Sequence, residues 1–243
     1  MQVYRDADEV AESVGRYLAV GFDLREPALL VATPEHVDAV MGVLAASGWP
    51  KTRIDHRGLL FLADAQQTLA AIMAGDSPSH AAFESVIGGR LDEIAARFPG
   101  CHTRVFGEMV DLLSRDGNVD AAVRLEQLWN KAARRRRFSL LCAYNLDVFD
   151  QEAQLDVLPE ICRAHSHVLA AANPSRLEEA VDSALTETLG GQAERVWAVV
   201  REQPRRRHVP LAQLALMWVS SQLPRSAETI LTSAREHYLR EPA

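Results

Sequence analysis

Cysteine and histidine side chains form the first group in this sequence that could do chemistry. Cys162, His165 and His167 follow one another as Cys-x-x-His-x-His. On a helix, Cys162 and His165 would share one face because they are three residues apart. Together with Cys142 they can ligate a soft metal, although a structural zinc site needs a fourth ligand. A ligand pocket, a redox role and packing of these side chains in the core are the alternatives, and we favour packing.

Acidic and aromatic residues stand where apolar runs end. Asp64 closes the run LLFLAD, and Glu108 follows Phe106 and Gly107 at the end of another run. Glu108 can accept hydrogen bonds from a ligand or pair with Arg104, and pairing is slightly favoured. For Asp64, capping of the next helix is favoured over ligand binding.

The run LLCAY ends in Tyr144, with Cys142 two residues earlier. The hydroxyl of Tyr144 can reach a crevice at the strand ends, or the ring can pack on the sheet with a solvated hydroxyl. Ligands of open α/β sheets bind at the carboxyl ends of strands. The candidate ligand-binding residues are therefore Asp64, Glu108, Cys142, Tyr144 and His165.

Familiar catalytic motifs do not occur in the sequence. It has no Gly-x-Ser-x-Gly elbow, no His-Glu-x-x-His pair and no Cys-x-x-Cys. We therefore assign no catalytic residue and expect no cofactor.

Short apolar runs alternate with longer amphipathic stretches through the first 170 residues. Strands are predicted at 2–4, 27–33, 59–64, 103–106 and 139–144, each followed by a helical pattern. Residues 76–98 are predicted to be helical throughout, and 158–172 to be the helix after the last strand. Such alternation predicts a parallel sheet with helices on both faces.

The pattern changes near residue 174. Helices are predicted over 177–189, 192–202, 211–222 and 226–239, and no further strand is predicted. We therefore expect an α/β domain over residues 1–173 and an α-helical module over residues 174–243. In that module, Leu211, Leu214, Met217 and Trp218 form an apolar stripe that can be core or contact surface, with core favoured.

Charge and composition limit the partners. Net charge is -7 with a sequence pI of about 5.6, which argues against a general nucleic-acid binder because phosphate neutralisation needs surplus Lys and Arg. The N-terminus lacks an apolar signal core, no apolar stretch reaches the length of a membrane span, and three cysteines are too few for a disulfide framework. A cytoplasmic protein is expected.

Several segments together resemble the MEDS family, a sensory domain named from methanogens, methylotrophs and a dichloromethane-responsive regulator. The resemblance covers residues 1 to about 170, in the family's order and approximate spacing. It is carried by Gly21 and by the segments EPALLVAT (26–33), GLLFLAD (58–64), RVFGEMVDLL (104–113), LEQLWN (125–130), LCAY (141–144) and ICRAHSH (161–167).

The resemblance implies a parallel-sheet, three-layer RecA/KaiC-like domain whose nucleotide machinery is lost. Arg5-Asp-Ala-Asp-Glu9, the first connection between strand and helix, has no Gly and no Lys. A phosphate-binding loop needs both, and the carboxylates here would repel a triphosphate. ATP hydrolysis by the usual route is therefore not expected.

Family members are usually attached to signalling modules, so the resemblance implies a sensor. We expect a non-catalytic regulatory protein that binds a small ligand at the strand ends and works with a signalling partner or as a homodimer. The alternative is a scaffold with no ligand that docks a signalling partner through its C-terminal helices.

Overall fold

The computed structural model describes residues 1–165, 167–168, 173–202 and 209–240. By its internal contacts the chain divides into two compact units, Met1–Asn145 and Leu146–Ala243. Each unit is described by itself. The domain boundary expected after residue 173 stays a prediction, because a division by contacts does not test which segments fold independently.

The first unit is built on a parallel sheet in the order β1-β7-β6-β2-β3. Its strands are β1 (Gln2–Tyr4), β2 (Ala28–Ala32), β3 (Leu60–Asp64), β6 (Thr103–Gly107) and β7 (Phe138–Asn145). All five predicted strands are confirmed. Every residue of β2 is buried, as expected of a strand covered by helices on both faces.

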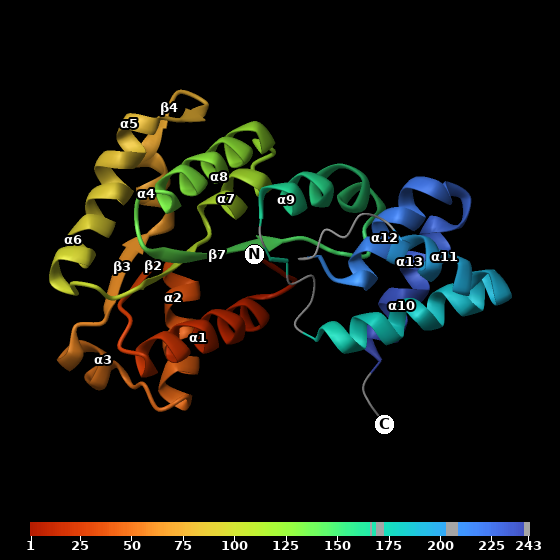
Figure 1. Cartoon of the computed structure of the whole chain (residues 1–243), viewed down its shortest axis with the longest axis horizontal. Coiled ribbons are helices and arrows are strands. Elements are labelled where there is room, and N and C mark those ends of the chain that lie inside the picture. The colour runs from red at the N-terminus through yellow and green to blue at the C-terminus, as the bar shows by residue number, and fades with distance from the viewer. Residues whose placement is uncertain (166, 169–172, 203–208, 241–243) are drawn as a thin grey trace. The chain divides into compact units, whose positions relative to one another are not determined.

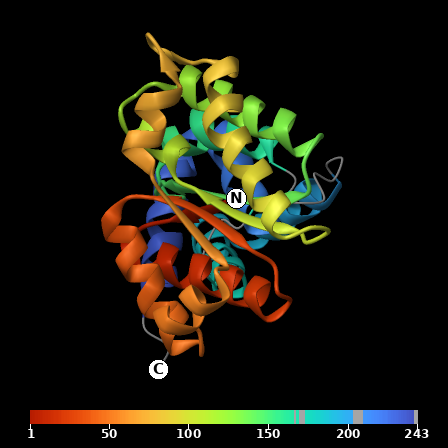
Figure 2. The ribbon, with the colours of Figure 1, turned by 90° about the vertical axis from the view of Figure 1, so that its left-hand side faces the viewer.

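Helices cover both faces of this sheet (Figures 1 and 2). In Figure 2 the helices of residues 7–57, red to orange, lie below the sheet, and the helices of residues 65–133, gold to green, lie above it. The helices of the unit are α1 (Ala7–Asp23), α2 (Pro34–Ala46), α3 (Lys51–Arg57), α4 (Ala65–Ile72), α5 (His80–Phe83), α6 (Gly89–Arg97), α7 (Met109–Arg115) and α8 (Val119–Ala133). The expected α/β class is confirmed.

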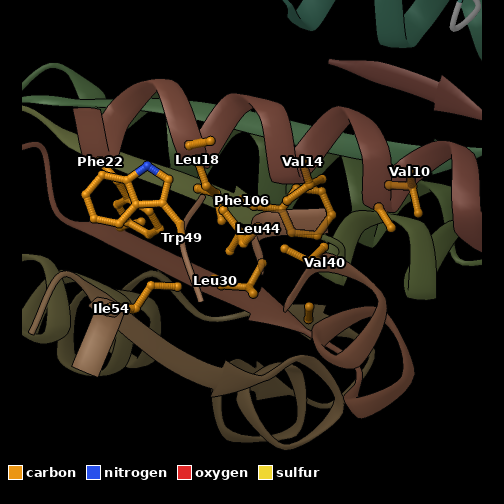
Figure 3. Close-up of a cluster of buried hydrophobic side chains, with 14 of the residues drawn as sticks. Val10, Val14, Leu18, Phe22, Leu30, Val40, Leu44, Trp49, Ile54 and Phe106 are labelled. Carbon is orange, nitrogen blue, oxygen red and sulfur yellow. The ribbon is translucent and has the colours of Figure 1, made fainter. Parts of the chain in front are cut away.

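A hydrophobic cluster joins α1 and α2 to the sheet (Figure 3). Val10, Val14, Leu18 and Phe22 recur every four residues along α1, so they share the face turned toward the cluster. Burial of such a face at roughly 25 cal/mol per Å² of apolar surface fixes the helix on the sheet. The cluster thereby anchors α1 and α2 to the sheet.

The prediction of continuous helix over 76–98 is wrong at its start. β4 (Met73–Ala74) and β5 (Ser77–Pro78) form a small antiparallel hairpin, separated by Gly75 and Asp76. Gly75 has φ 64°, a left-handed conformation that glycine adopts without steric cost. Helical structure resumes at His80 and includes a π-helical turn, Glu84–Gly88.

The described part of the second unit is helical. After a π-helical turn, Ala153–Val157, its helices are α9 (Leu158–Ala164), α10 (Pro174–Leu189), α11 (Ala193–Glu202), α12 (Leu211–Gln222) and α13 (Pro224–Leu239). The predicted C-terminal helices α10–α13 are confirmed. The helix predicted over 158–172 ends at Ala164, and residues 166 and 169–172 lie outside the described residues.

Pro174 and Pro224 each begin a helix of the second unit. Proline is favourable at that position because its φ is already helical and its missing N–H has no helical partner to lose. Among the helices of the described residues, none combines the length and apolar character that a membrane crossing requires.

Candidate functional site

Glu108 lies directly after β6, at the carboxyl end of a strand inside the sheet, and is 1% exposed. Its Oε1 accepts a hydrogen bond of 2.8 Å from the backbone N–H of Thr33, and its Oε2 lies 2.6 Å from His36 Nδ1. Thr33 follows β2, and His36 lies in the first turn of α2. The three residues meet because β2 and β6 are neighbours in the sheet.

The pairing with Glu108 controls the protonation of His36. The hydrogen bond to Glu108 raises the pKa of His36 above its ordinary value, and desolvation by burial opposes that rise. A carboxylate stabilises the imidazolium form of a nearby histidine. Glu108 therefore favours the charged form of His36.

A second carboxylate, Asp111, lies in α7 and is also 1% exposed. Its Oδ1 accepts a 2.6 Å hydrogen bond from the backbone N–H of Asn145, and its Oδ2 accepts one of 3.0 Å from the hydroxyl of Tyr4. Arg115 Nε lies 3.2 Å from the same Oδ2. Asp111 thus binds the ends of β1 and β7, which are adjacent strands.

Burial makes ionisation of this second group costly. Desolvation raises the pKa of Asp111, while the hydrogen bond from Asn145 and the charge of Arg115 lower it. Desolvation also raises the pKa of Tyr4, and the charge of Asp111 adds to that rise. Groups with a perturbed pKa at strand ends are candidates for a functional site.

The rings of Tyr4 and His36 join the two groups. Their centroids are 6.0 Å apart in an edge-to-face arrangement. We call Tyr4, His36, Glu108 and Asp111 the carboxyl-edge network. It combines two buried carboxylates, an imidazole and a phenol, all hydrogen-bonded at the carboxyl ends of the strands.

Arg104 does not pair with Glu108, so that expectation is wrong. Arg104 Nε donates a 2.7 Å hydrogen bond to Glu26 Oε2. Arg104 lies near the beginning of β6 and Glu108 just beyond its end, so the whole strand separates the two residues. The Glu26–Arg104 pair therefore lies at the amino ends of the strands, whereas Glu108 lies at their carboxyl ends.

Asp64 ends β3, and its Oδ1 accepts a 2.7 Å hydrogen bond from the N–H of Gln67. It is the N-cap of α4, as the favoured interpretation of the sequence had it. Because β3 is the last strand of the sheet, Asp64 lies two strands away from Glu108. A role for Asp64 in ligand binding stays a prediction.

Tyr144 and Cys142 lie in β7 and are both buried. The hydroxyl of Tyr144 donates a 2.8 Å hydrogen bond to Glu126 Oε1 in α8, so of the two alternatives the one with a solvated hydroxyl is wrong. Desolvation, reinforced by the charge of Glu126, raises the pKa of both Tyr144 and Cys142 well above their ordinary values. Their roles in ligand binding stay predictions.

The remaining predicted residues belong to the second unit. Cys162 lies in α9, and His165 follows the end of that helix in an extended conformation. His165 Nδ1 lies 2.8 Å from the carbonyl oxygen of Ile161. Because Cys142 belongs to the first unit and the other two residues to the second, metal binding by this trio stays a prediction.

A groove also lies within the second unit, between α10 and α13. It encloses about 400 Å³ and is lined by side chains of both charges, among them Arg176, Glu179, His237 and Arg240. The lining holds two arginines and one glutamate. Since no strand of the sheet ends there, we do not take it as the candidate site.

The amino end of α1 follows β1, and there the resemblance to RecA/KaiC-like domains led us to look for a phosphate-binding loop. Here Asp6 caps the helix by accepting a 2.9 Å hydrogen bond from the N–H of Glu9, and Asp8 and Glu9 stand in its first turn. Carboxylates already use the positive end of the helix dipole. The chain itself thus supplies the negative charge that a phosphate would bring.

Sequence reasoning found Glu108 but missed Tyr4, His36 and Asp111. Asp111 stands three residues after Glu108 in the segment FGEMVDLL, a spacing that marks one helix face and could have drawn attention to it. No local signal indicates His36 or Tyr4. They reach the site only through the order of the strands.

Comparison with known families supplies one match. A family model described as MEDS, MEthanogen/methylotroph, DcmR Sensory domain, matches residues 1–166 of the 243. The match includes all five strands and the carboxyl-edge network, and it ends before α10–α13. Comparisons with curated proteins and with solved structures found no match.

Proposed function

The chain belongs to the MEDS family of sensory domains, and on that premise we propose that it is a non-catalytic sensor whose ligand binds at the carboxyl ends of its strands. MEDS domains are typically non-catalytic. The proposal adds a small-molecule ligand and places its site at the carboxyl-edge network, with Glu108 and Asp111 as the polar groups that recognise it.

The burial of two carboxylates at the strand ends carries this proposal. A buried carboxylate pays a desolvation cost that its partners often do no more than offset, and a domain needing only stability could place apolar residues at these positions. Parallel α/β sheets bind ligands at this edge. A ligand that exchanges hydrogen bonds or a proton with the network would shift the ends of β1, β2, β6 and β7 together.

The first turn of α1 supports a non-nucleotide ligand. Asp6, Asp8 and Glu9 stand where a RecA/KaiC-like enzyme would need glycines and a lysine. Their charges oppose binding of a triphosphate. We therefore propose a RecA/KaiC-like domain that has exchanged nucleotide hydrolysis for ligand sensing.

Native mass spectrometry of the purified full chain tests this proposal. We expect a mass above that of the polypeptide, lost on denaturation, in the wild type, and less of it in Glu108→Gln. The matched control is Glu26→Gln, which changes a partly buried glutamate at the amino ends of the strands and should retain the extra mass. Two results would contradict a tightly bound ligand at the network. One is a wild type whose measured mass equals that of the polypeptide, and the other is an extra mass that Glu108→Gln retains as fully as the wild type.

One observation favours the scaffold function as a second candidate. Leu211, Leu214, Met217 and Trp218 of α12 are only partly buried, whereas Ala212, Ala215, Leu216 and Val219 of the same helix are buried. The stripe expected to be core thus flanks the buried face. This function would be favoured if the ligand-free chain captures a signalling partner. The partner should then be lost in Leu214→Glu but retained in Val199→Glu, a substitution on α11.

A further inference from the structure

The outer edge of the sheet in the first unit is formed by β3, whose sequence is LFLAD. Leu62, its central residue, is 48% exposed. Lysine or proline on an edge strand, or a helix over it, normally prevents pairing with another chain. β3 contains neither lysine nor proline, and no residue of the strand is fully buried.

The register with β2 determines which backbone groups of β3 face outward. Leu60 and Leu62 are the Cα partners of Ala28 and Leu30, and the N–H of Ala28 donates to the carbonyl oxygen of Leu59. In a parallel ladder, alternate residues bond to the neighbouring strand. The N–H and C=O groups of Leu60 and Leu62 therefore point away from β2, and so does the N–H of Asp64. The C=O of Asp64 belongs to the first turn of α4.

The outward backbone groups of Leu60 and Leu62 have no backbone partner within the described part of the chain. Apart from the ladder with β2, no backbone hydrogen bond there involves Leu60 or Leu62. The edge is therefore open to one more strand, and that strand would bond through three residues spaced two apart.

Charge is distributed unequally along β3. Arg57 and Arg97 are exposed at its amino end, where an ideal Cβ on Gly58 would lie 3.2 Å from Arg97 Cζ. Asp64 stands at its carboxyl end. Asp55, the nearest acid on α3, is already paired with Lys51 at 3.0 Å. The edge therefore has a basic and an acidic end.

We propose that β3 pairs with β3 of a second copy of this chain, antiparallel about a two-fold axis at Leu62. In this register Leu62 meets Leu62 of the second copy, and Leu60 meets its Asp64. Leu60 and Leu62 bring both their N–H and C=O groups to the pairing, and Asp64 brings its N–H. A two-fold interface must be self-complementary. This edge meets that condition because it offers outward backbone donors and acceptors, an exposed leucine at the axis, and a basic and an acidic end.

The antiparallel direction follows from the charges. It brings Asp64 of each copy to the basic end formed by Arg57 and Arg97 of the other. A parallel arrangement would instead place like charges together, which costs free energy. The two sheets would then form one continuous sheet across the dimer.

Concentration-dependent sedimentation of the full chain tests the proposal. We expect a dimer for the wild type and a dissociation constant raised about tenfold or more in Leu62→Lys, because the pairing opposes two like charges at the axis. Leu62 is half-exposed and its amide is not used within the sheet, so the variant should fold. Val20→Lys is the matched control, since Val20 is 53% exposed on α1, and it should dimerise like the wild type.

A cysteine at the axis tests the register. Residues of a hydrogen-bonded antiparallel pair have Cα atoms about 5.5 Å apart, a separation that a disulfide spans. In a Cys101→Ser background, which removes the exposed thiol, Leu62→Cys should give a covalent dimer when treated with diamide. Leu24→Cys in the same background should give no covalent dimer, although Leu24 is 63% exposed.

Two results would overturn the proposal. A wild type that is monomeric at about 100 µM, well above the micromolar range of ordinary weak complexes, would leave the edge available to an extended segment of another protein. A dimer that persists unchanged in Leu62→Lys would place the interface on another surface.

Discussion

His36 Nδ1 and Glu108 Oε2 lie 2.6 Å apart although 72 residues separate them in the sequence. The pair joins the first turn of α2 to the end of β6, and both side chains are buried. A change in the charge of His36 therefore changes the free energy that holds two elements of the strand-end region together.

The first prediction concerns the pH dependence of this pair. Because Glu108 raises the pKa of His36 in the folded state, the pair's contribution is fully present below the unfolded pKa, about 6.5. It is lost as pH rises through the raised folded pKa. The loss of unfolding free energy in His36→Gln, about 1–3 kcal/mol for a charged hydrogen bond, should be larger at pH 5.5 than at pH 9.

Urea unfolding of wild type and His36→Gln across this pH range measures the difference. His56→Gln is the control because His56 is an exposed histidine on α3, and its difference from wild type should stay small at both pH values. A His36→Gln difference that grows with pH would contradict a raised pKa.

The second prediction concerns Asp64 as a helix cap. Asp64→Ala removes the hydrogen bond to the N–H of Gln67 and should lower the free energy of unfolding by about 0.5–2 kcal/mol. Asp64→Asn keeps an acceptor oxygen and should lose much less, because Asn and Asp rank about equally as N-cap residues. If any ligand mass is also lost in Asp64→Asn while stability is retained, Asp64 contacts the ligand as well.

The third prediction compares two glycines in packed helices. An ideal Cβ on Gly15 of α1 would lie 2.7 Å from Cβ of Val43 in α2, whereas one on Gly42 of α2 would meet nothing within 4 Å. Gly15→Ala should cost about 1–3 kcal/mol because the helices must move apart. Gly42→Ala should stabilise the protein by about 0.5–1 kcal/mol because alanine favours helix.

Thermal and urea unfolding of both glycine variants gives the comparison. Stabilisation of both would show that α1 and α2 can separate at no cost, contrary to close packing at Gly15.

The fourth prediction concerns the three thiols. Cys101 is exposed, whereas Cys142 and Cys162 are buried, and burial raises the pKa of Cys142 well above its ordinary value. Since the thiolate is the reactive form, Cys101 should react rapidly with a thiol reagent at pH 8 and the other two only after unfolding. Cys101→Ser should abolish the rapid phase, and a rapid phase that remains would contradict the burial of Cys142 or Cys162.

Sequence alone was enough for the class of fold and for several local features. Short apolar runs between amphipathic stretches indicated the parallel sheet, because a buried strand needs apolar side chains on both faces. The acids after the first strand excluded a phosphate-binding loop, because that loop depends on local residue types. Asp64 was recognised as a cap because capping involves only residues three apart.

Only the tertiary structure decided which side chains meet. Periodicity shows that a strand is buried, but the order β1-β7-β6-β2-β3 depends on how all helices pack on the sheet. That order places His36 beside Glu108 and Tyr4 beside Asp111, and it moves Asp64 to the edge. Long-range packing, which no local pattern records, therefore built the network and left β3 as the open strand.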